Sequence, residues 1–155
     1  MDDDSLFALL NYSVLPAWVM LVVLPRWKGT RWAVHSGAYP VGLGLAYAIL
    51  LFTDQPGPQG ASFFTLEGVT RIFTTPHTII ACWLHYLIFD LFVGSWIARD
   101  AGRLGIRHAF VIPSLVLTLM FGPVGLMSWL GVRAVARRRF LLLEATSDAA
   151  DPVAA

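Results

Sequence analysis

Charged side chains are scarce in this chain, and long apolar runs take their place. Only 14% of the 155 residues are Asp, Glu, Lys or Arg, whereas 57% are hydrophobic. A soluble domain normally carries about a quarter charged residues. The shortage argues against an ordinary soluble domain, and a net charge of +1 gives no basis for a nucleic-acid partner.

Cysteine and the common cofactor motifs are also nearly absent. Cys82 is the single cysteine, so a disulfide framework is excluded. The chain has no glycine-rich phosphate loop, no G-x-S-x-G elbow and no C-x-x-C pair. Its four histidines include no H-x-x-x-H or H-x-x-H-H pair of the kind that membrane di-iron sites use. We therefore expect neither a bound metal nor a cofactor.

Four apolar runs dominate what is present. Each is close to the roughly 20 residues that a helix needs to cross a hydrocarbon core. Only helices satisfy their own backbone in such segments, because the bilayer offers no water. The runs predict an all-α membrane protein, a four-transmembrane-helix bundle forming one domain over residues 1–144. The expected spans are 6–24, 33–52, 78–98 and 109–132, followed by a disordered tail over 145–155.

The connection between the second and third runs mixes apolar and charged residues. Glu67 and Arg71 are spaced four apart, as on one face of a helix. The stretch is too short and too charged to cross, so we expect an interfacial or re-entrant segment here. It would form either a lid on the headgroups or the mouth of a lipid-side ligand pocket.

Basic residues divide almost equally between the two sides of this predicted bundle. The loops after the first and third spans hold six, and the opposite side holds five. The short loops and the acidic N-terminus favour loops one and three in the cytoplasm, with both termini outside.

The third run places two polar side chains in the apolar stretch WLHYLIFDLFVGSW, residues 83–96. At about 100° per residue, Tyr86 and Asp90 share one face and His85 points about 140° away from Asp90. We expect Asp90 and Tyr86 to face the bundle interior and to share a hydrogen bond. A carboxylate at mid-membrane costs at least about 2.5–3.5 kcal/mol, so it is usually protonated, paired or facing a cavity. Asp90 is therefore either a structural residue that holds two helices together by hydrogen bonds or a functional acid.

Aromatic residues concentrate around Asp90. Core packing and anchoring at the membrane interface explain most of them. Beside a buried carboxylate they would also suit a long, flat, apolar ligand with one polar end, held in a cavity open sideways to the membrane. The residues expected to contact such a ligand are Trp83, Phe89, Phe92, Phe121 and Trp129.

Two motifs resemble a known family. The stretch WLHYLIFDLFVG, residues 83–94, is similar to the signature of the abscisic-acid-deficient-four-like (neoxanthin synthase) family of small membrane proteins. Further on, Arg107-His108 leads into the fourth run and GPVG at 122–125 breaks it, as in that family. The matching block covers residues 76–129, about a third of the chain.

The resemblance implies carotenoid chemistry. Plant members are needed to turn violaxanthin, a xanthophyll with epoxide end groups, into neoxanthin, which carries an allene. This isomerisation needs an acid to protonate the epoxide oxygen and a base to take a proton from the polyene. By motif position Asp90 is the acid candidate, His85 or His108 the base candidate, and Tyr86 a proton-sharing or orienting group.

The resemblance leaves two functions open. The first is a carotenoid or xanthophyll isomerase that works within the bilayer. The second is a non-catalytic carotenoid-binding or pigment-assembly protein. The expected partners are membrane lipid and a carotenoid or similar long apolar ligand, and the chain could also form a homo-oligomer or a pigment–protein complex. The lack of a transit peptide suggests a bacterial member, located in the inner membrane.

Overall fold

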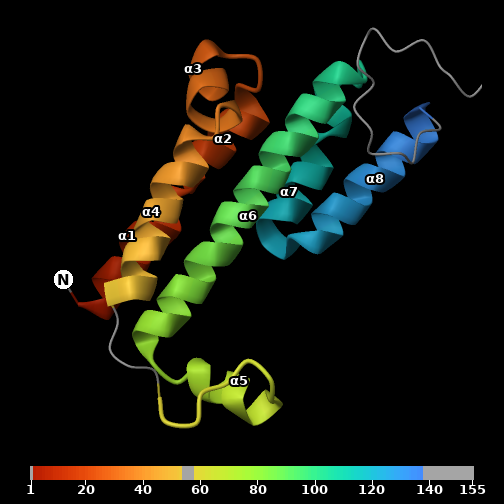
Figure 1. The fold of residues 1–155 in the computed structure, drawn as a ribbon. Helices are drawn as coiled ribbons and strands as arrows, with labels where there is room; N and C mark the ends of the chain where they lie inside the picture. The colour runs from red at the N-terminus through yellow and green to blue at the C-terminus, as the bar shows by residue number, and fades with distance from the viewer. Residues whose placement is uncertain (1, 54–57, 138–155) are drawn as a thin grey trace, which may run out of the picture.

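The computed structural model describes residues 2–53 and 58–137, and every regular element in these ranges is helical (Figure 1). The prediction of an all-α protein is confirmed. The expected disordered tail, residues 145–155, lies outside the described residues.

The first apolar run is one long helix with a break in its middle. Helix α1 covers Asp3–Ser13 and α2 covers Leu15–Val23. Asp2 caps α1, because its side chain accepts a hydrogen bond of 2.7 Å from the Ser5 amide. Pro16 lies in the first turn of α2, where its missing N–H leaves no bond unmade.

The second and third apolar runs also form long helices. The second consists of α3 (Lys28–Thr30), a π-helical turn η1 (Arg31–His35) and α4 (Ala38–Thr53). The third is α6 (Pro76–Arg103), which Thr75 caps through a bond from the Thr78 amide. Three helical stretches are long and apolar enough to cross a membrane: Asp3–Val23, Lys28–Phe52 and Pro76–Arg103.

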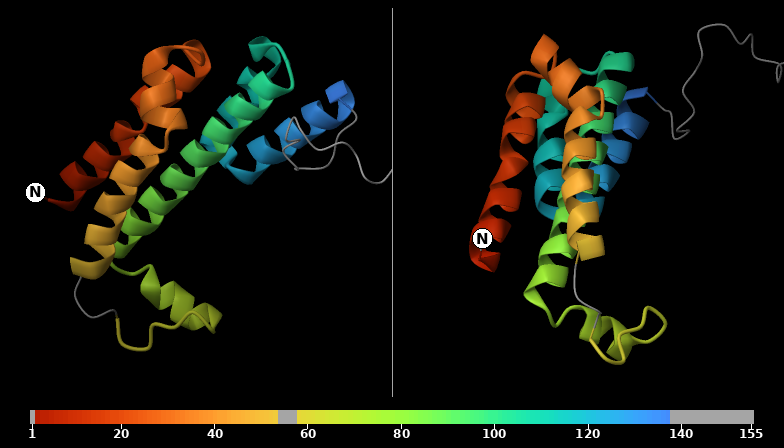
Figure 2. Two further views of the ribbon diagram at one scale, coloured as in Figure 1. Left: turned by 45° about the horizontal axis from the view of Figure 1, so that its top comes forward. Right: turned by 60° about the vertical axis from the view of Figure 1, so that its left-hand side comes forward.

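Helix α6 is the centre of the bundle, and α1, α2, α4 and the last two helices pack around it (Figures 1 and 2). Gly94 allows α2 to approach closely, because a Cβ atom there would lie 2.6 Å from the Trp18 ring. The fully buried side chains include Leu21 of α2, Leu84, Leu91 and Ile97 of α6, Leu115 of α7 and Trp129 of α8.

The fourth apolar run is not a single span. After the short turn η2 (His108–Phe110), it forms two helices, α7 (Ile112–Phe121) and α8 (Pro123–Arg137). Gly122 adopts φ +38° between them, and Pro123 cannot continue α7. The chain reverses here into a helical hairpin (Figure 1). The arms are about 15 and 22 Å long, shorter than the hydrocarbon core of about 30 Å.

Small residues and a polar pair hold the two arms of the hairpin together. A Cβ atom on Gly125 would lie 2.1 Å from the Thr118 amide nitrogen, so only glycine permits this approach. The hydroxyl groups of Ser114 and Ser128 are 3.0 Å apart across the hairpin. The prediction of one span over 109–132 differs from the structure because hydropathy reports apolar surroundings, not the direction of the chain.

Because of the hairpin, the basic residues lie at different ends of the bundle than four spans would have placed them. Because α8 returns toward the end of the bundle where α6 finishes, its last turns lie at the opposite end from the N-terminus (Figures 1 and 2). The four predicted spans divided the basic residues almost equally between the two sides and placed both termini on one side. Both predictions are wrong. Among the Lys and Arg residues described between 2 and 133, one, Arg71, lies toward the end of the bundle where α6 begins. Seven gather at this end, which we call the basic end: Arg26, Lys28, Arg31, Arg99, Arg103, Arg107 and Arg133.

The connection before α6 contains a short helix, α5 (Leu66–Ile72), capped by the Thr65 side chain. The expected pairing on its face is confirmed, since Arg71 and Glu67 form an ion pair of 2.7 Å. Helix α5 lies beyond the start of α6, away from the hairpin (Figure 1). The segment that turns back within the bundle is the α7–α8 hairpin. An interfacial position for α5 stays a prediction.

Candidate functional site

Asp90 contacts the tip of the α7–α8 hairpin. It lies at the midpoint of the 28-residue α6, and a Cβ atom on Gly122 would be only 2.6 Å from its Oδ1. Helix α8 begins at the next residue, Pro123, so the partial positive charge of its N-terminus lies near the carboxylate. The structure thus brings together the two motifs, 83–94 and 122–125, that are far apart in the sequence.

The depth of this contact follows from helix geometry. Helix α6 is about 42 Å long, which exceeds the hydrocarbon core by about 12 Å. Its midpoint would therefore lie near the centre of a bilayer that the helix crosses. Asp90 and the tip of the hairpin would meet far from water on either side.

Tyr86 does not face the bundle interior, contrary to the sequence prediction. Its side chain is 59% exposed, and among the described residues no hydrogen bond joins it to Asp90. The physical reason is the reach of the hairpin. Because the hairpin ends at the level of Asp90, it half-buries that side chain and leaves Tyr86, one turn nearer the start of α6, uncovered.

Most of the predicted ligand contacts lie on the outer surface of the bundle. Trp83, Phe89, Phe92 and Phe121 are all exposed. Trp83 donates a hydrogen bond of 2.9 Å to the Asn11 side chain, so α1 orients it. With Tyr86, these four exposed residues make up what we call the aromatic surface, which covers more than one face of α6: Trp83 lies beside α1, and Phe89 packs on His85 toward α4. It can contact lipid, a lipid-soluble ligand or a second copy of the chain.

The structure contains an apolar cavity beside the fourth apolar run. Its volume is about 570 Å³, and it lies between the arms of the hairpin. Phe110, Pro113, Val132 and Val135 are among the residues that line it. Asp90 and the aromatic surface do not line this cavity.

The two candidate bases lie in different parts of the molecule. His85 packs its ring against Phe89, at a centroid distance of 4.6 Å, and against Tyr47 of α4, at 5.7 Å. His108 donates from Nε2 to the Val22 carbonyl oxygen, 2.9 Å away, at the basic end. Along α6, His85 is about 7.5 Å from Asp90, whereas His108 shares a cavity with Ala98 and Gly102, which are about 12 and 18 Å from Asp90 along the helix. The structure therefore does not bring all the proposed catalytic residues together.

A second carboxylate, Asp100, is more deeply buried than Asp90, and the sequence analysis did not single it out. It is 4% exposed and accepts a hydrogen bond of 3.0 Å from the Trp129 indole. Arg133 lies 3.6 Å from it and Arg103 3.5 Å from it. Trp129 is fully buried in this cluster, so it does not contact an external ligand. In the sequence, the i, i+3 spacing of Asp100 and Arg103 was the feature that could have indicated this cluster.

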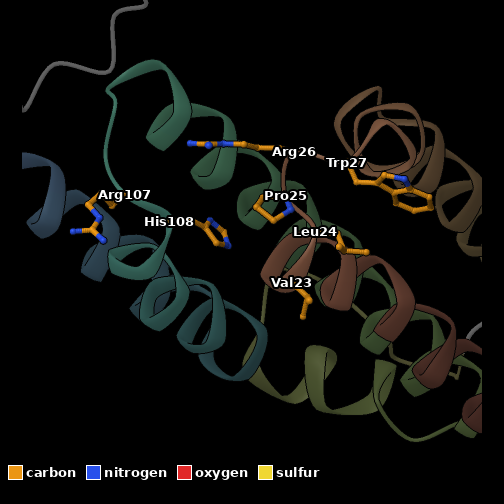
Figure 3. Close-up of a pocket in the computed structure, with 7 residues that line it drawn as sticks. All are labelled: Val23, Leu24, Pro25, Arg26, Trp27, Arg107 and His108. Carbon is orange, nitrogen blue, oxygen red and sulfur yellow. The ribbon is translucent and has the colours of Figure 1, made fainter.

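The basic end holds a further group of polar side chains. The hydroxyl of Ser95 is 3.0 Å from His35 Nδ1 and accepts a bond of 2.7 Å from Arg99. Next to this group, the end of α2 and the 107–108 segment enclose a cavity of about 550 Å³ (Figure 3). Among the described residues, no group of three or more His, Cys, Asp or Glu side chains could hold a metal ion.

These features define a class: small helical proteins with apolar helices long enough to cross a membrane and a carboxylate at the tip of a helical hairpin. The profile of the ABA DEFICIENT 4-like family matches residues 5–129, and the chain belongs to that family. The match extends the resemblance seen at 76–129 to the first two apolar helices.

A curated relative is Protein ABA DEFICIENT 4, chloroplastic, from Arabidopsis thaliana. It is 27% identical to this chain over 146 residues, which cover 88% of this chain. The match covers 64% of the relative, so this chain spans less than two thirds of the relative's length. No solved structure matches the chain.

Proposed function

We propose that this chain is an integral membrane protein that binds a carotenoid or xanthophyll and rearranges one of its end groups by acid–base chemistry. Membership of the ABA DEFICIENT 4-like family supports the carotenoid assignment. The aromatic surface supports it further, because flat conjugated ligands pack well against exposed aromatic rings.

The contact between Asp90 and Gly122 carries the proposal. In a bilayer that α6 crosses, this contact would put a carboxyl group at the depth of the hydrocarbon core. A charge there costs about 2.5–3.5 kcal/mol, more than the roughly 0.3–1 kcal/mol that the N-terminus of α8 contributes, so a neutral, proton-donating acid is favoured. Asp100, the other carboxylate of α6, is engaged by Trp129 and Arg133. Asp90 is therefore the acid that a lipid-soluble ligand could reach.

In the proposed reaction, Asp90 gives its proton to the epoxide oxygen as the C–O bond breaks. A base takes a proton from a polyene carbon, and the electron pair released completes the allene. The epoxide oxygen becomes a hydroxyl group, and one proton given balances one taken, without any oxidant. His85 is the favoured base candidate, because it lies nearer to Asp90 in depth than His108 does.

A specific observation supports the alternative, a non-catalytic carotenoid-binding or pigment-assembly protein. Asp90, His85 and Tyr86 make no hydrogen bonds with one another in the described part of the chain, so no proton path joins them. In this alternative the aromatic surface binds the pigment, and the contact of Asp90 with Gly122 has only a structural role, holding α6 against the hairpin.

The test compares pigments in a bacterial host that makes an epoxide-bearing xanthophyll. The host would express the native chain, Asp90→Asn, or Glu67→Gln as a control carboxylate-to-amide change on the exposed face of α5. We expect the native chain and the control to produce a rearranged pigment. Asp90→Asn should still bind pigment but convert at least about 100-fold less, since amide cannot donate the proton.

Two results would overturn this assignment. Full conversion by Asp90→Asn would remove Asp90 from the chemistry and leave it a structural pin. A native chain that purifies with bound pigment of unchanged structure would favour the pigment-binding alternative.

A further inference from the structure

The basic end of the bundle contains a cavity whose lining includes three arginines and two histidines. Its volume is about 280 Å³, and it lies where the end of α2, the turn η1 and the end of α6 meet. Five of its lining residues are basic side chains: Arg26, Arg31, His35, Arg99 and His108.

Among the described residues that line this cavity, none is a carboxylate that could balance Arg26 or Arg31. Asp100 is the nearest acid on α6, but it accepts a hydrogen bond from Trp129 on α8, on the other side of the helix. The side chains of Arg26 and Arg31 form no ion pair with any acid among the described residues. A cavity lined by one sign of charge concentrates the field and attracts an ion of the opposite sign.

Part of this lining is held in place before any ligand binds. Arg99 donates to the Ser95 hydroxyl at 2.7 Å and to the His35 carbonyl oxygen at 3.4 Å. His108 is held by its bond to the Val22 carbonyl. Anchored donors lose less conformational entropy when they bind an anion.

Small residues make room for a ligand. Ala98, Ala101 and Gly102 form the α6 wall of the cavity, and a Cβ atom on Gly102 would meet nothing within 4 Å. The neighbouring cavity of about 550 Å³ shares Arg26 and His108 with it and adds the apolar side chains of Val23 and Leu24 at the end of α2 (Figure 3). A cationic cavity next to an apolar one suits an amphiphile with an anionic head.

We propose that this pair of cavities binds a phosphate group, either the headgroup of an anionic membrane lipid or free phosphate. Arginine presents paired donors that match phosphate oxygens. The cavity lies at the ends of the Asp3–Val23 and Pro76–Arg103 stretches, which is the level of lipid headgroups in a bilayer that they cross. Basic pockets between transmembrane helices bind phosphorylated headgroups in this way. The site is separate from Asp90 and does not depend on the proposed reaction.

The experiment uses the full chain purified in a neutral detergent. Its melting temperature is measured with phosphatidylglycerol, with zwitterionic phosphatidylcholine and with inorganic phosphate, each titrated over the same range. The variants are Arg26→Gln/Arg31→Gln, which removes charge, and Gly102→Leu, which fills the cavity and keeps every charge. Lys28→Gln is the control, because it removes a cation of the basic end that does not line the cavity. Circular dichroism checks that each variant is folded.

We expect phosphatidylglycerol to raise the melting temperature of the native chain, and phosphatidylcholine to leave it unchanged. Affinity should fall about fivefold for each arginine removed. Gly102→Leu should abolish the effect, and Lys28→Gln should retain most of it. Equal protection by inorganic phosphate would assign the site to free phosphate. A preference for phosphatidylglycerol that survives Gly102→Leu, or that Lys28→Gln reduces as much as the arginine variant does, would overturn the proposal, because general surface charge would then explain it.

Discussion

The indole Nε1 of Trp129 donates a hydrogen bond of 3.0 Å to Oδ2 of Asp100, and both side chains are buried. This bond joins α8 to α6, two helices that are not consecutive in the chain. It lies near the open end of the hairpin, whereas the contact of Gly122 with Asp90 lies at the tip. The hairpin is therefore fixed against α6 at both ends.

The Trp129–Asp100 bond should contribute measurably to stability. Trp129→Phe keeps an aromatic ring in the core but leaves the buried carboxylate without its N–H donor, at a cost of about 1–3 kcal/mol in the free energy of unfolding. Trp83→Phe is the control, because that indole bonds an exposed partner and should cost about 1 kcal/mol or less. Reversible unfolding in mixed micelles measures both. Equal costs would show that the buried bond has no special role.

Gly122 should not tolerate a side chain. Gly122→Ala places a Cβ atom at φ +38° and against Asp90, so we expect a loss of about 1–3 kcal/mol from the backbone conformation alone. Gly131→Ala, in α8 with nothing within 4 Å of the added Cβ, should be neutral or stabilising by up to about 1 kcal/mol.

A double-mutant cycle separates the two causes at Gly122. Asp90→Ala removes the clash but not the backbone conformation, so Gly122→Ala should cost less in that background. A cost that is the same with and without the Asp90 side chain would contradict the contact between these residues.

The hairpin predicts a specific membrane topology. We expect the basic end to face the cytoplasm, since lysine and arginine accumulate there. Single cysteines at Lys28 and Val135, introduced in a Cys82→Ser background, should be protected from a membrane-impermeant thiol reagent in intact cells. A cysteine at Gln59 should be labelled. If Val135→Cys is labelled together with Gln59→Cys, the run over 109–132 crosses the membrane once and the hairpin is wrong.

The two histidine candidates should behave differently in the pigment assay. His85→Phe keeps a ring to pack against Phe89 and Tyr47 but removes the base, so we expect conversion to fall about 100-fold or more. His108→Gln keeps a donor for the Val22 carbonyl and should convert pigment almost normally. The reverse pattern would assign the base to His108 and would require it to move toward Asp90.

Several properties of this protein follow from the sequence by itself. The lengths of the apolar runs determine that it is helical, because each helix satisfies its own backbone. They predict four spans, and three of these are long enough in the structure to cross a membrane. The spacing of Glu67 and Arg71 determines their ion pair, since neighbours on a helix face depend only on local geometry. The motif over 83–94 was sufficient to indicate the family.

Other properties were decided only by the tertiary structure. Hydropathy is the same for one span and for two arms of a hairpin, so the reversal at Gly122 was visible in the sequence only as a break. The roles of Asp90, Asp100 and Tyr86 depend on how far along α6 the hairpin reaches. It covers the half of the helix that contains Asp100, ends at Asp90 and leaves Tyr86 exposed, because an acid or a phenol on a helix is buried only where another helix packs over it.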